Sequence, residues 1–263
     1  MKKKKSILVN VFLIFALTLL MGNIIIGQAQ EKKVYINGID PGYPPFAYID
    51  EKGNPAGFEV DCLNWIAQEM GFEVKHQPTA WDGIIPALKA KKIDLIASGM
   101  TVTKERSEQV DFTECYWVVH DLVIVRQDSD LNLITAMSTG KNVGVQRGTV
   151  ENTWIIDELI KKGVNLNLKL YDSPFLLVED LVNGRLDVAV GAEPVSTTAI
   201  KQNKPIKVLG LVGMEDQKYS YAVRKGDKEL LDILNEGLKK LKSSDEWDKI
   251  QSKWEMWKVG VEG

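Results

Sequence analysis

The chain alternates short runs of apolar, β-rich residues with longer segments whose apolar residues recur at helical spacing. Helical segments are predicted at 61–70, 83–91, 151–162, 174–183 and 197–202. Candidate strands are the apolar runs at 34–39, 94–98, 122–125, 143–145, 168–171, 186–190, 206–210 and 219–223. Alternation of this kind indicates α/β architecture with largely parallel sheets.

The end of the chain, 227–257, has helical periodicity throughout. One face of this predicted helix carries leucines at 230, 231, 234, 238 and 241. A stripe of this spacing is typical of a helix that packs against a core. The sequence has no repeat at a fixed period and no low-complexity stretch, so a solenoid or propeller is not indicated.

The first 29 residues have the pattern of an export signal. Four lysines precede a mostly apolar run from Ile7 to Ile26, and Gly27-Gln28-Ala29 places small residues where a signal peptidase cleaves. We interpret 1–29 as a cleaved signal peptide, which predicts a periplasmic protein. The alternative is an uncleaved membrane anchor, because about twenty apolar residues can span a bilayer. No cysteine lies near the cleavage site to carry a lipid.

Composition is that of an ordinary globular protein. The 263 residues are 44% hydrophobic and 26% charged, enough for two modest domains. Without 1–29, which hold four lysines and no acids, the formal charge falls from −3 to −7. No basic stripe remains to suggest nucleic acid. The two cysteines, Cys62 and Cys115, either form a disulfide in an oxidising compartment or stay separate thiols.

The stretch SGMTVTKERS, 98–107, carries the strongest chemical signal. It follows a predicted strand, turns at Gly99 and begins a helical turn. Ligands of α/β sheets bind at the carboxyl ends of strands. Arg106 would supply a planar, bidentate donor for a carboxylate there. The alternative is that Arg106 pairs on the surface with a nearby acid: Glu105, Glu108 or Asp111.

Four stretches in order carry a resemblance to a known family. They are GIDPGYPPFAYIDEKGNPAGFEVD (38–61), WDGIIPALKAKKIDLIASGMTVTKERSEQVDFT (81–113), VGVQRGTVEN (143–152) and YSYAVRKGDKELLDILNEGLKKL (219–241). Together they resemble extracellular solute-binding protein family 3, the amino-acid-binding proteins of ABC transporters with the type II periplasmic binding fold. The resemblance covers residues 33–257.

The resemblance implies two α/β lobes, each a mostly parallel sheet flanked by helices, that close on a ligand between them. Lobe 1 is expected at 31–117 plus 216–263, and lobe 2 at 118–215. Two hinge crossovers are expected near 117–121 and 213–218. Hinge closure of this type is a general property of periplasmic binding proteins.

The resemblance also implies which residues hold the ligand. Arg106 matches the carboxylate clamp, and Thr101 matches a residue whose N–H and hydroxyl reach the ligand's α-groups. Gly99, after Ser98, matches the residue whose carbonyl accepts from the α-ammonium group. Thr149 matches the lobe-2 residue that completes the carboxylate site at a helix N-terminus.

Further positions match the walls around the ligand side chain. Tyr43 and Trp81 are expected to cover that side chain, and Gln146 to tune its choice. Asp40 lies beside the site with either a binding or a structural role. The alternatives are that Tyr43 is a core aromatic, that Trp81 covers a helix start and that Gln146 is an exposed loop amide.

One position departs from the family pattern. The aspartate that most members place after the strand at 186–190, to pair with the ligand's α-ammonium group, is Ala192 here. A buried ammonium without a counter-charge is costly. Either Glu193 reaches in, or Glu151 supplies the charge, or the ligand lacks an α-ammonium group.

The expected function is the substrate-binding component of an ABC importer. It would capture a polar amino acid and deliver it to the membrane permease as a monomer. The alternatives are a binding protein for a non-α-amino carboxylate, a sensor module for a membrane partner and a cyclohexadienyl dehydratase-like enzyme. The sequence has no catalytic motif that we recognise, and no cofactor or metal site is expected. His76 and His120 fit structural roles.

Overall fold

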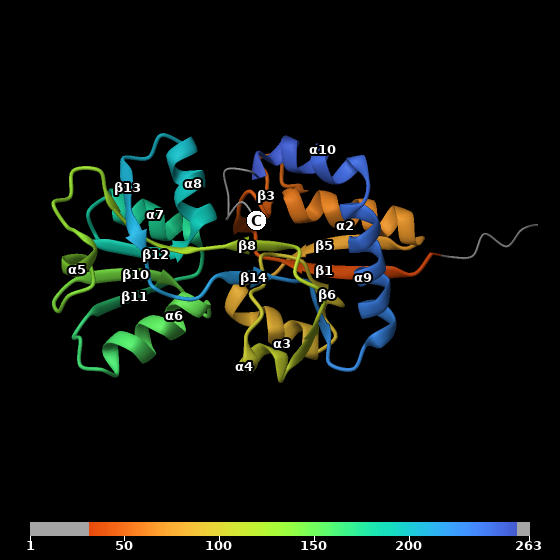
Figure 1. Cartoon of the computed structure of the whole chain (residues 1–263), viewed down its shortest axis with the longest axis horizontal. Helices are drawn as coiled ribbons and strands as arrows, with labels where there is room; N and C mark the ends of the chain where they lie inside the picture. The colour runs from red at the N-terminus through yellow and green to blue at the C-terminus, as the bar shows by residue number, and fades with distance from the viewer. Residues whose placement is uncertain (1–31, 257–263) are drawn as a thin grey trace, which may run out of the picture. The chain divides into compact units, whose positions relative to one another are not determined.

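The computed structural model describes residues 32–256, so the predicted signal peptide lies outside the described residues. Residues 34–256 form two five-stranded sheets with helices on their faces (Figure 1). We call the elements around the sheet that contains β1 lobe 1, and those around the sheet that contains β10 lobe 2. The α/β prediction is confirmed.

The lobe 1 sheet has the strand order β5-β1-β6-β15-β7. Only β15 runs against the others, since it pairs antiparallel with β6 and β7 while β5, β1 and β6 are parallel. Four strands therefore end at the same edge, where ligand sites form. The strands are β1 (Val34–Ile39), β5 (Glu73–Pro78), β6 (Leu95–Ile96), β7 (Val110–Phe112) and β15 (Ala222–Arg224).

Lobe 1 also contains a small antiparallel sheet and its covering helices. The small sheet consists of β2 (Gly42–Tyr43), β3 (Ala47–Ile49) and β4 (Pro55–Ala56). A 3-10 turn at Trp81–Gly83 leads into α3. The helices are α2 (Phe58–Met70), α3 (Ile84–Lys89), α4 (Lys104–Ser107), α9 (Lys228–Lys242) and α10 (Asp245–Trp254).

The lobe 2 sheet repeats this arrangement with the order β11-β10-β12-β9-β13. Here β9 is the strand that runs against its neighbours. The strands are β9 (Asp121–Arg126), β10 (Asn142–Gln146), β11 (Asn167–Tyr171), β12 (Val188–Ala192) and β13 (Ile206–Leu211). The helices are α5 (Leu133–Ala136), α6 (Val150–Trp154) with a π-helical continuation at Ile155–Ile160, α7 (Pro174–Val182) and α8 (Glu193–Lys201).

Two strands connect the sheets. Strand β8 (Trp117–Val119) leads from lobe 1 into β9, and β14 (Gln217–Tyr219) leads back from β13 toward β15. They pair antiparallel, with Tyr219 opposite Trp117, and run side by side between the sheets (Figure 1). The prediction of a two-lobed fold with two crossovers is confirmed.

Some boundaries were predicted wrongly. The expected strand at 219–223 is divided between β14 and β15, because Ser220 donates its N–H to Met100 O instead of to a strand partner. The expected helix at 227–257 breaks after α9, where Ser244 caps α10 by accepting from Glu246 N. Helix α8 begins at Glu193, ahead of the predicted 197, because Pro194 is tolerated in a first turn.

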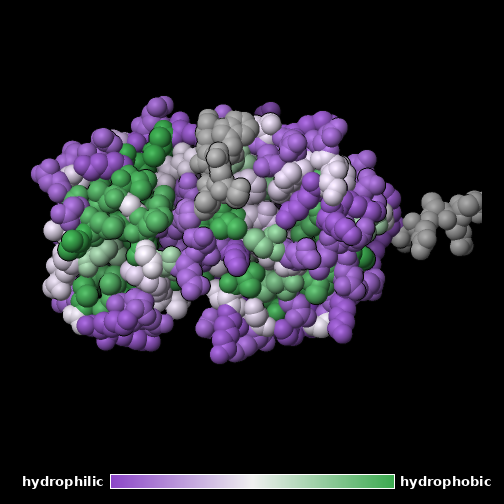
Figure 2. Space-filling model, viewed as in Figure 1, coloured by the Kyte–Doolittle hydropathy of each residue, from purple (hydrophilic) through white to green (hydrophobic). Residues whose placement is uncertain are grey.

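The surface of lobe 2 carries exposed apolar side chains near β13 and α5. Leu133, Ile134, Val208 and Leu211 are among them, and Figure 2 shows hydrophobic surface over this lobe. No helix within 32–256 is long and apolar enough to cross a membrane.

Candidate ligand-binding site

A cavity lies where residues of both lobes meet, with an empty volume of about 520 Å³ including its mouth. All but one of the predicted site residues line it: Asp40, Tyr43, Trp81, Ser98, Gly99, Thr101, Arg106, Gln146, Thr149 and Glu151. The exception is Glu193.

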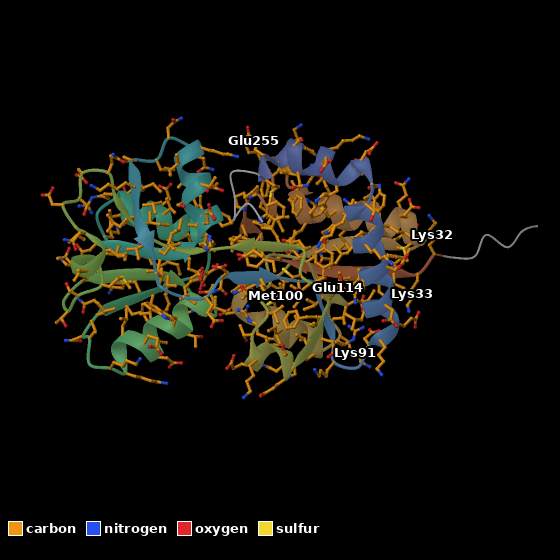
Figure 3. All side chains as sticks on the ribbon, in the orientation of Figure 1. Lys32, Lys33, Lys91, Met100, Glu114 and Glu255 are labelled. Atoms are coloured by element: carbon orange, nitrogen blue, oxygen red, sulfur yellow. The ribbon has the colours of Figure 1, made fainter. Side chains whose placement is uncertain are left out.

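The loop after β6 forms the lobe 1 wall at Gly99. This residue has φ +64°, and a Cβ added there would lie 2.5 Å from Cε1 of the Tyr43 ring, so only glycine fits. Its N–H donates to Glu59 Oε2 at 2.7 Å, and the Ser98 hydroxyl accepts from Asp40 N at 2.9 Å. Thr101 forms an isolated antiparallel β-bridge with Tyr219 of β14. Met100, which lies between Gly99 and Thr101 in the chain, is labelled in Figure 3.

Arg106 is buried, with 9% of its surface exposed, and forms no ion pair with any carboxylate of residues 32–256. Its guanidinium donates to Thr101 O at 2.9 Å and, across to lobe 2, to Gly148 O at 3.3 Å. It lies 5.5 Å from the centre of the Trp81 ring. Burial lowers the pKa of Arg106. The surface-pairing alternative is not observed, because Asp111 instead pairs with Lys225 at 2.7 Å.

Trp81 adds a donor without a partner. Its indole Nε1 is buried and has no hydrogen-bond partner within the described part of the chain. Buried donors are nearly always satisfied in folded proteins. An unsatisfied donor beside Arg106, in the lining of a cavity, is an arrangement that a polar ligand would complete.

The N-terminus of α6 forms the facing wall from lobe 2. The Thr149 hydroxyl caps this helix by accepting from Asn152 N at 3.2 Å, and it donates to Gln146 O at 3.0 Å. Because the free N–H groups of a helix start favour an anion, Arg106 and α6 together supply positive potential from both lobes.

Asp40 and Gln146 connect the two lobes at another part of the cavity. Gln146 Nε2 donates to Asp40 Oδ2 at 2.7 Å, and Gly42 N donates to Asp40 Oδ1 at 2.9 Å. Both side chains are buried, and burial raises the pKa of Asp40. Gln146 is therefore not the exposed loop amide of the alternative interpretation.

Sequence reasoning missed Asp121, Gln217 and Tyr219, which also line the cavity. Asp121 is the first residue of β9, only 4% exposed, and pairs in register with Ala192. The Tyr219 hydroxyl is 2.5 Å from that of Tyr43. A charged residue immediately before the apolar run at 122–125 was the available signal for Asp121.

Glu193 begins α8 and donates its backbone N–H to His120 O at 2.8 Å. Its side chain does not line the cavity, so the alternative in which Glu193 reaches in to pair with the ligand is not observed. His120 itself contacts Asp216 through Nδ1 at 3.0 Å, between the two crossovers.

The remaining candidate chemistry is structural. His76 lies between Asn37 and Asn64, and burial lowers its pKa to about 4, so its ring stays neutral. Cys62 and Cys115 are separate thiols, and the Cys115 thiol donates to Trp117 O at 3.1 Å. Residues 32–256 contain no cluster of three or more side chains suited to a metal ion.

Two α/β lobes joined by two crossovers, with a polar cavity between them, define the class of two-lobed ligand-binding proteins. The chain belongs to the bacterial extracellular solute-binding proteins, family 3, whose sequence model matches residues 35–256.

Similar proteins share nearly the whole chain. The L-arginine-binding protein of Pseudomonas aeruginosa is 36% identical over 233 residues, which is 86% of this chain and 89% of that protein. A solved ancestral arginine-binding protein bound to arginine has a TM-score of 0.78 and 34% identity, covering 86% of this chain and 99% of that one. An ancestral amino-acid-binding protein, a precursor of cyclohexadienyl dehydratase, has a TM-score of 0.76 and 32% identity, covering 84% and 95%.

Proposed function

We propose that this protein is the substrate-binding component of an ABC importer, which captures an amino acid between its lobes and delivers it to a membrane permease. The observation that carries the proposal is Arg106, a buried cation that lines the cavity without an ion-pair partner in residues 32–256. A buried guanidinium is stable when it is paired. The carboxylate of an amino acid would supply that pairing.

Within this proposal, each wall of the cavity has a role. Arg106, Thr101 and the α6 N-terminus at Thr149 bind the ligand's carboxylate, and the carbonyl of Gly99 accepts from its α-ammonium group. Tyr43 and Trp81 cover the ligand, and Gln146 positions Asp40. Lobe 1 would comprise 31–117 plus 216–263, and lobe 2 118–215. The protein would act as a monomer in the periplasm after cleavage of 1–29.

The charges in the cavity favour a cationic amino acid. Three carboxyl groups, those of Asp40, Asp121 and Glu151, line the cavity with a single cation, Arg106. Each added positive charge on a ligand is favoured in such a site, because opposite charges attract strongly in a low dielectric. The names of the similar arginine-binding proteins agree with this choice.

A titration calorimeter tests the function directly. The protein is refolded to remove any bound ligand and titrated with the twenty amino acids and with simple organic acids. We expect one cationic amino acid to bind with a Kd of about 1 μM or lower, or about −8 kcal/mol. Silence from every amino acid would contradict the proposal.

The carboxylate clamp is tested by Arg106→Ala. Loss of charge-assisted hydrogen bonds, about 1.5–3 kcal/mol each, should weaken binding by at least about 100-fold. The control is Arg185→Ala, an exposed arginine whose partner is Asp180. Unchanged affinity in Arg106→Ala, with a normal thermal melt, would refute the clamp.

A dehydratase remains the second candidate, favoured by one observation. Burial and the neighbouring Glu151 carboxyl raise the pKa of Asp121, so a carboxylic acid lines the cavity. Such an acid is what elimination chemistry requires. Turnover of prephenate by the purified protein would support the enzyme, and absence of turnover together with amino-acid binding would support the transporter.

A further inference from the structure

Asp121 occupies the position across the strand pair from Ala192. Strands β9 and β12 are antiparallel, and Asp121 is the register partner of Ala192 at their shared end. Directly opposed residues of an antiparallel pair lie on the same face, with Cβ atoms about 4.5–5.5 Å apart. A carboxyl at 121 therefore reaches nearly the same part of the cavity as a carboxyl at 192 would.

The Asp121 carboxyl has no cationic partner among residues 32–256. The residue is 4% exposed, neither carboxyl oxygen has a hydrogen-bond partner of good geometry among these residues, and the polar side chains that interact with it are those of Glu151 and Gln217. Burying a carboxyl in this way is costly unless a ligand or a charge compensates it. Because Asp121 also lines the cavity, the missing partner is one that a bound molecule can supply.

We propose that Asp121 binds the α-ammonium group of the amino-acid ligand and replaces, from the neighbouring strand, the lobe-2 aspartate that Ala192 lacks. The assignment rests on the proposed function. It makes Asp121 the residue that separates α-amino acids from their deaminated analogues, and it completes a site in which Arg106 binds the other α-group.

The other carboxyl groups fit this role less well. Both oxygens of Asp40 already accept hydrogen bonds, from Gln146 Nε2 and from Gly42 N. Glu193 does not line the cavity. Glu151, in the first turn of α6, interacts with both Arg106 and Asp121, so part of its charge is already compensated by the guanidinium of Arg106.

Several groups face Asp121 from the surrounding elements. They are Glu151 of α6, Gln217 and Tyr219 of β14, and Tyr43 of β2. None of them is a cation, and Arg106 of α4 interacts electrostatically with Glu151. In the empty cavity, burial and the nearby Glu151 carboxyl raise the pKa of Asp121, which favours its protonated form. Binding of an ammonium group favours the ionised form of Asp121, so binding should release a proton.

The test compares two probes, L-arginine and its 2-hydroxy analogue, which lacks only the α-ammonium group. Calorimetry on Asp121→Asn should show about 100-fold weaker arginine binding, since a charged partner is lost from a buried pair. The hydroxy analogue should bind to this variant no more weakly than to the wild type. Titrations in two buffers of different ionisation enthalpy should show a proton released by the wild type and not by Asp121→Asn.

The decisive experiment moves the carboxyl group from position 121 to position 192. In the double variant Asp121→Asn with Ala192→Asp, arginine affinity should recover at least about tenfold over Asp121→Asn alone. Asp128→Asn, an exposed aspartate of the same lobe, is the matched control and should bind as the wild type does. Thermal melts confirm that each variant is folded.

The outcomes separate the two proposals. Wild-type arginine affinity in Asp121→Asn, or a loss found instead in Glu193→Gln, would overturn the assignment and leave the transport function intact. Silence of the wild type toward every amino acid would overturn the proposed function, and the assignment with it.

Discussion

The carboxyl group of Glu59 lies behind the cavity, with none of its surface exposed. Its Oε2 accepts from Gly99 N at 2.7 Å, and its Oε1 accepts from the Tyr116 hydroxyl. Glu59 thereby connects Gly99, in the loop after β6, to Tyr116, which immediately precedes β8 of the first crossover. Burial raises the pKa of Glu59 to about 7, since these two hydrogen bonds offset only part of the desolvation.

Glu59 should therefore make stability depend on pH. Its folded pKa is above the unfolded value of 4.5, so its contribution is fully present below pH 4.5 and is lost as pH rises through 7. A Glu59→Gln variant has no such loss. We expect its stability relative to the wild type to rise by about 3 kcal/mol between pH 4 and pH 8.

Urea unfolding of both proteins at several pH values gives this difference. His76 acts in the opposite direction between pH 4 and 6.5, because its folded pKa is lowered to about 4, but it is common to both proteins and cancels. A constant difference across the range would show that Glu59 ionises as an exposed glutamate does.

At the scale of elements, α6 and α7 both begin with a hydroxyl side chain as the N-cap, but only the cap of α6 lies in the ligand cavity. Thr149 caps α6 by accepting from Asn152 N, and Ser173 caps α7 by accepting from Leu176 N. Thr149 lines the ligand cavity, whereas Ser173 does not. The two caps thus form a matched pair for separating helix stability from ligand binding.

Thr149→Ala and Ser173→Ala should each lower the free energy of unfolding by about 1 kcal/mol, the usual value of an N-cap. Only Thr149→Ala should also weaken binding of L-arginine, by about tenfold, because it removes a hydroxyl from the carboxylate site. Equal effects of the two variants on binding would mean that Thr149 acts on the helix alone. Denaturant melts and calorimetry supply both quantities.

At the scale of the whole molecule, direct contacts join the lobes around the cavity. Gln146 donates to Asp40, Arg106 donates to Gly148 O, and Thr198 Oγ1 donates to Pro44 O at 2.9 Å. Farther from the site, Glu255, which follows α10 and is labelled in Figure 3, pairs with Lys201 of α8 at 2.7 Å. The crossovers are also linked to each other, since Val212 N donates to Asp121 O at 2.9 Å. A ligand held by Asp121 would thus act at the hinge itself.

Hinge closure should be visible as a change in distance between the lobes. Spin labels on cysteines at Lys92 of lobe 1 and Lys169 of lobe 2, both exposed, report this distance in a Cys115→Ser background. Cys62 is buried and should not react. Saturating L-arginine should shorten and narrow the distance distribution, because only the closed state contacts the ligand from both sides. The same distribution with and without arginine, in a protein that binds it, would contradict closure.

Local signals in the sequence predicted most of the fold. The apolar run at 34–39 is β1 as predicted, and the leucine stripe at 230–241 lies on α9, because each depends on the spacing of near neighbours. The break at Ser243 and Ser244 was missed because the periodicity continues through it. Strands as short as β7 and β8 carry too few residues for a period to be visible.

Some features of the site likewise follow from local sequence, and others depend on tertiary contacts. The sequence by itself determined Gly99 and Arg106 as a unit, since a strand end, a turn and a helix start follow one another within ten residues. Tertiary structure alone decided that Asp121 lies opposite Ala192, that Glu59 supports Gly99 and that Glu193 is left outside the cavity. The physical reason is that strand register and lobe contact bring together residues far apart in the chain, and no local spacing encodes which of them meet.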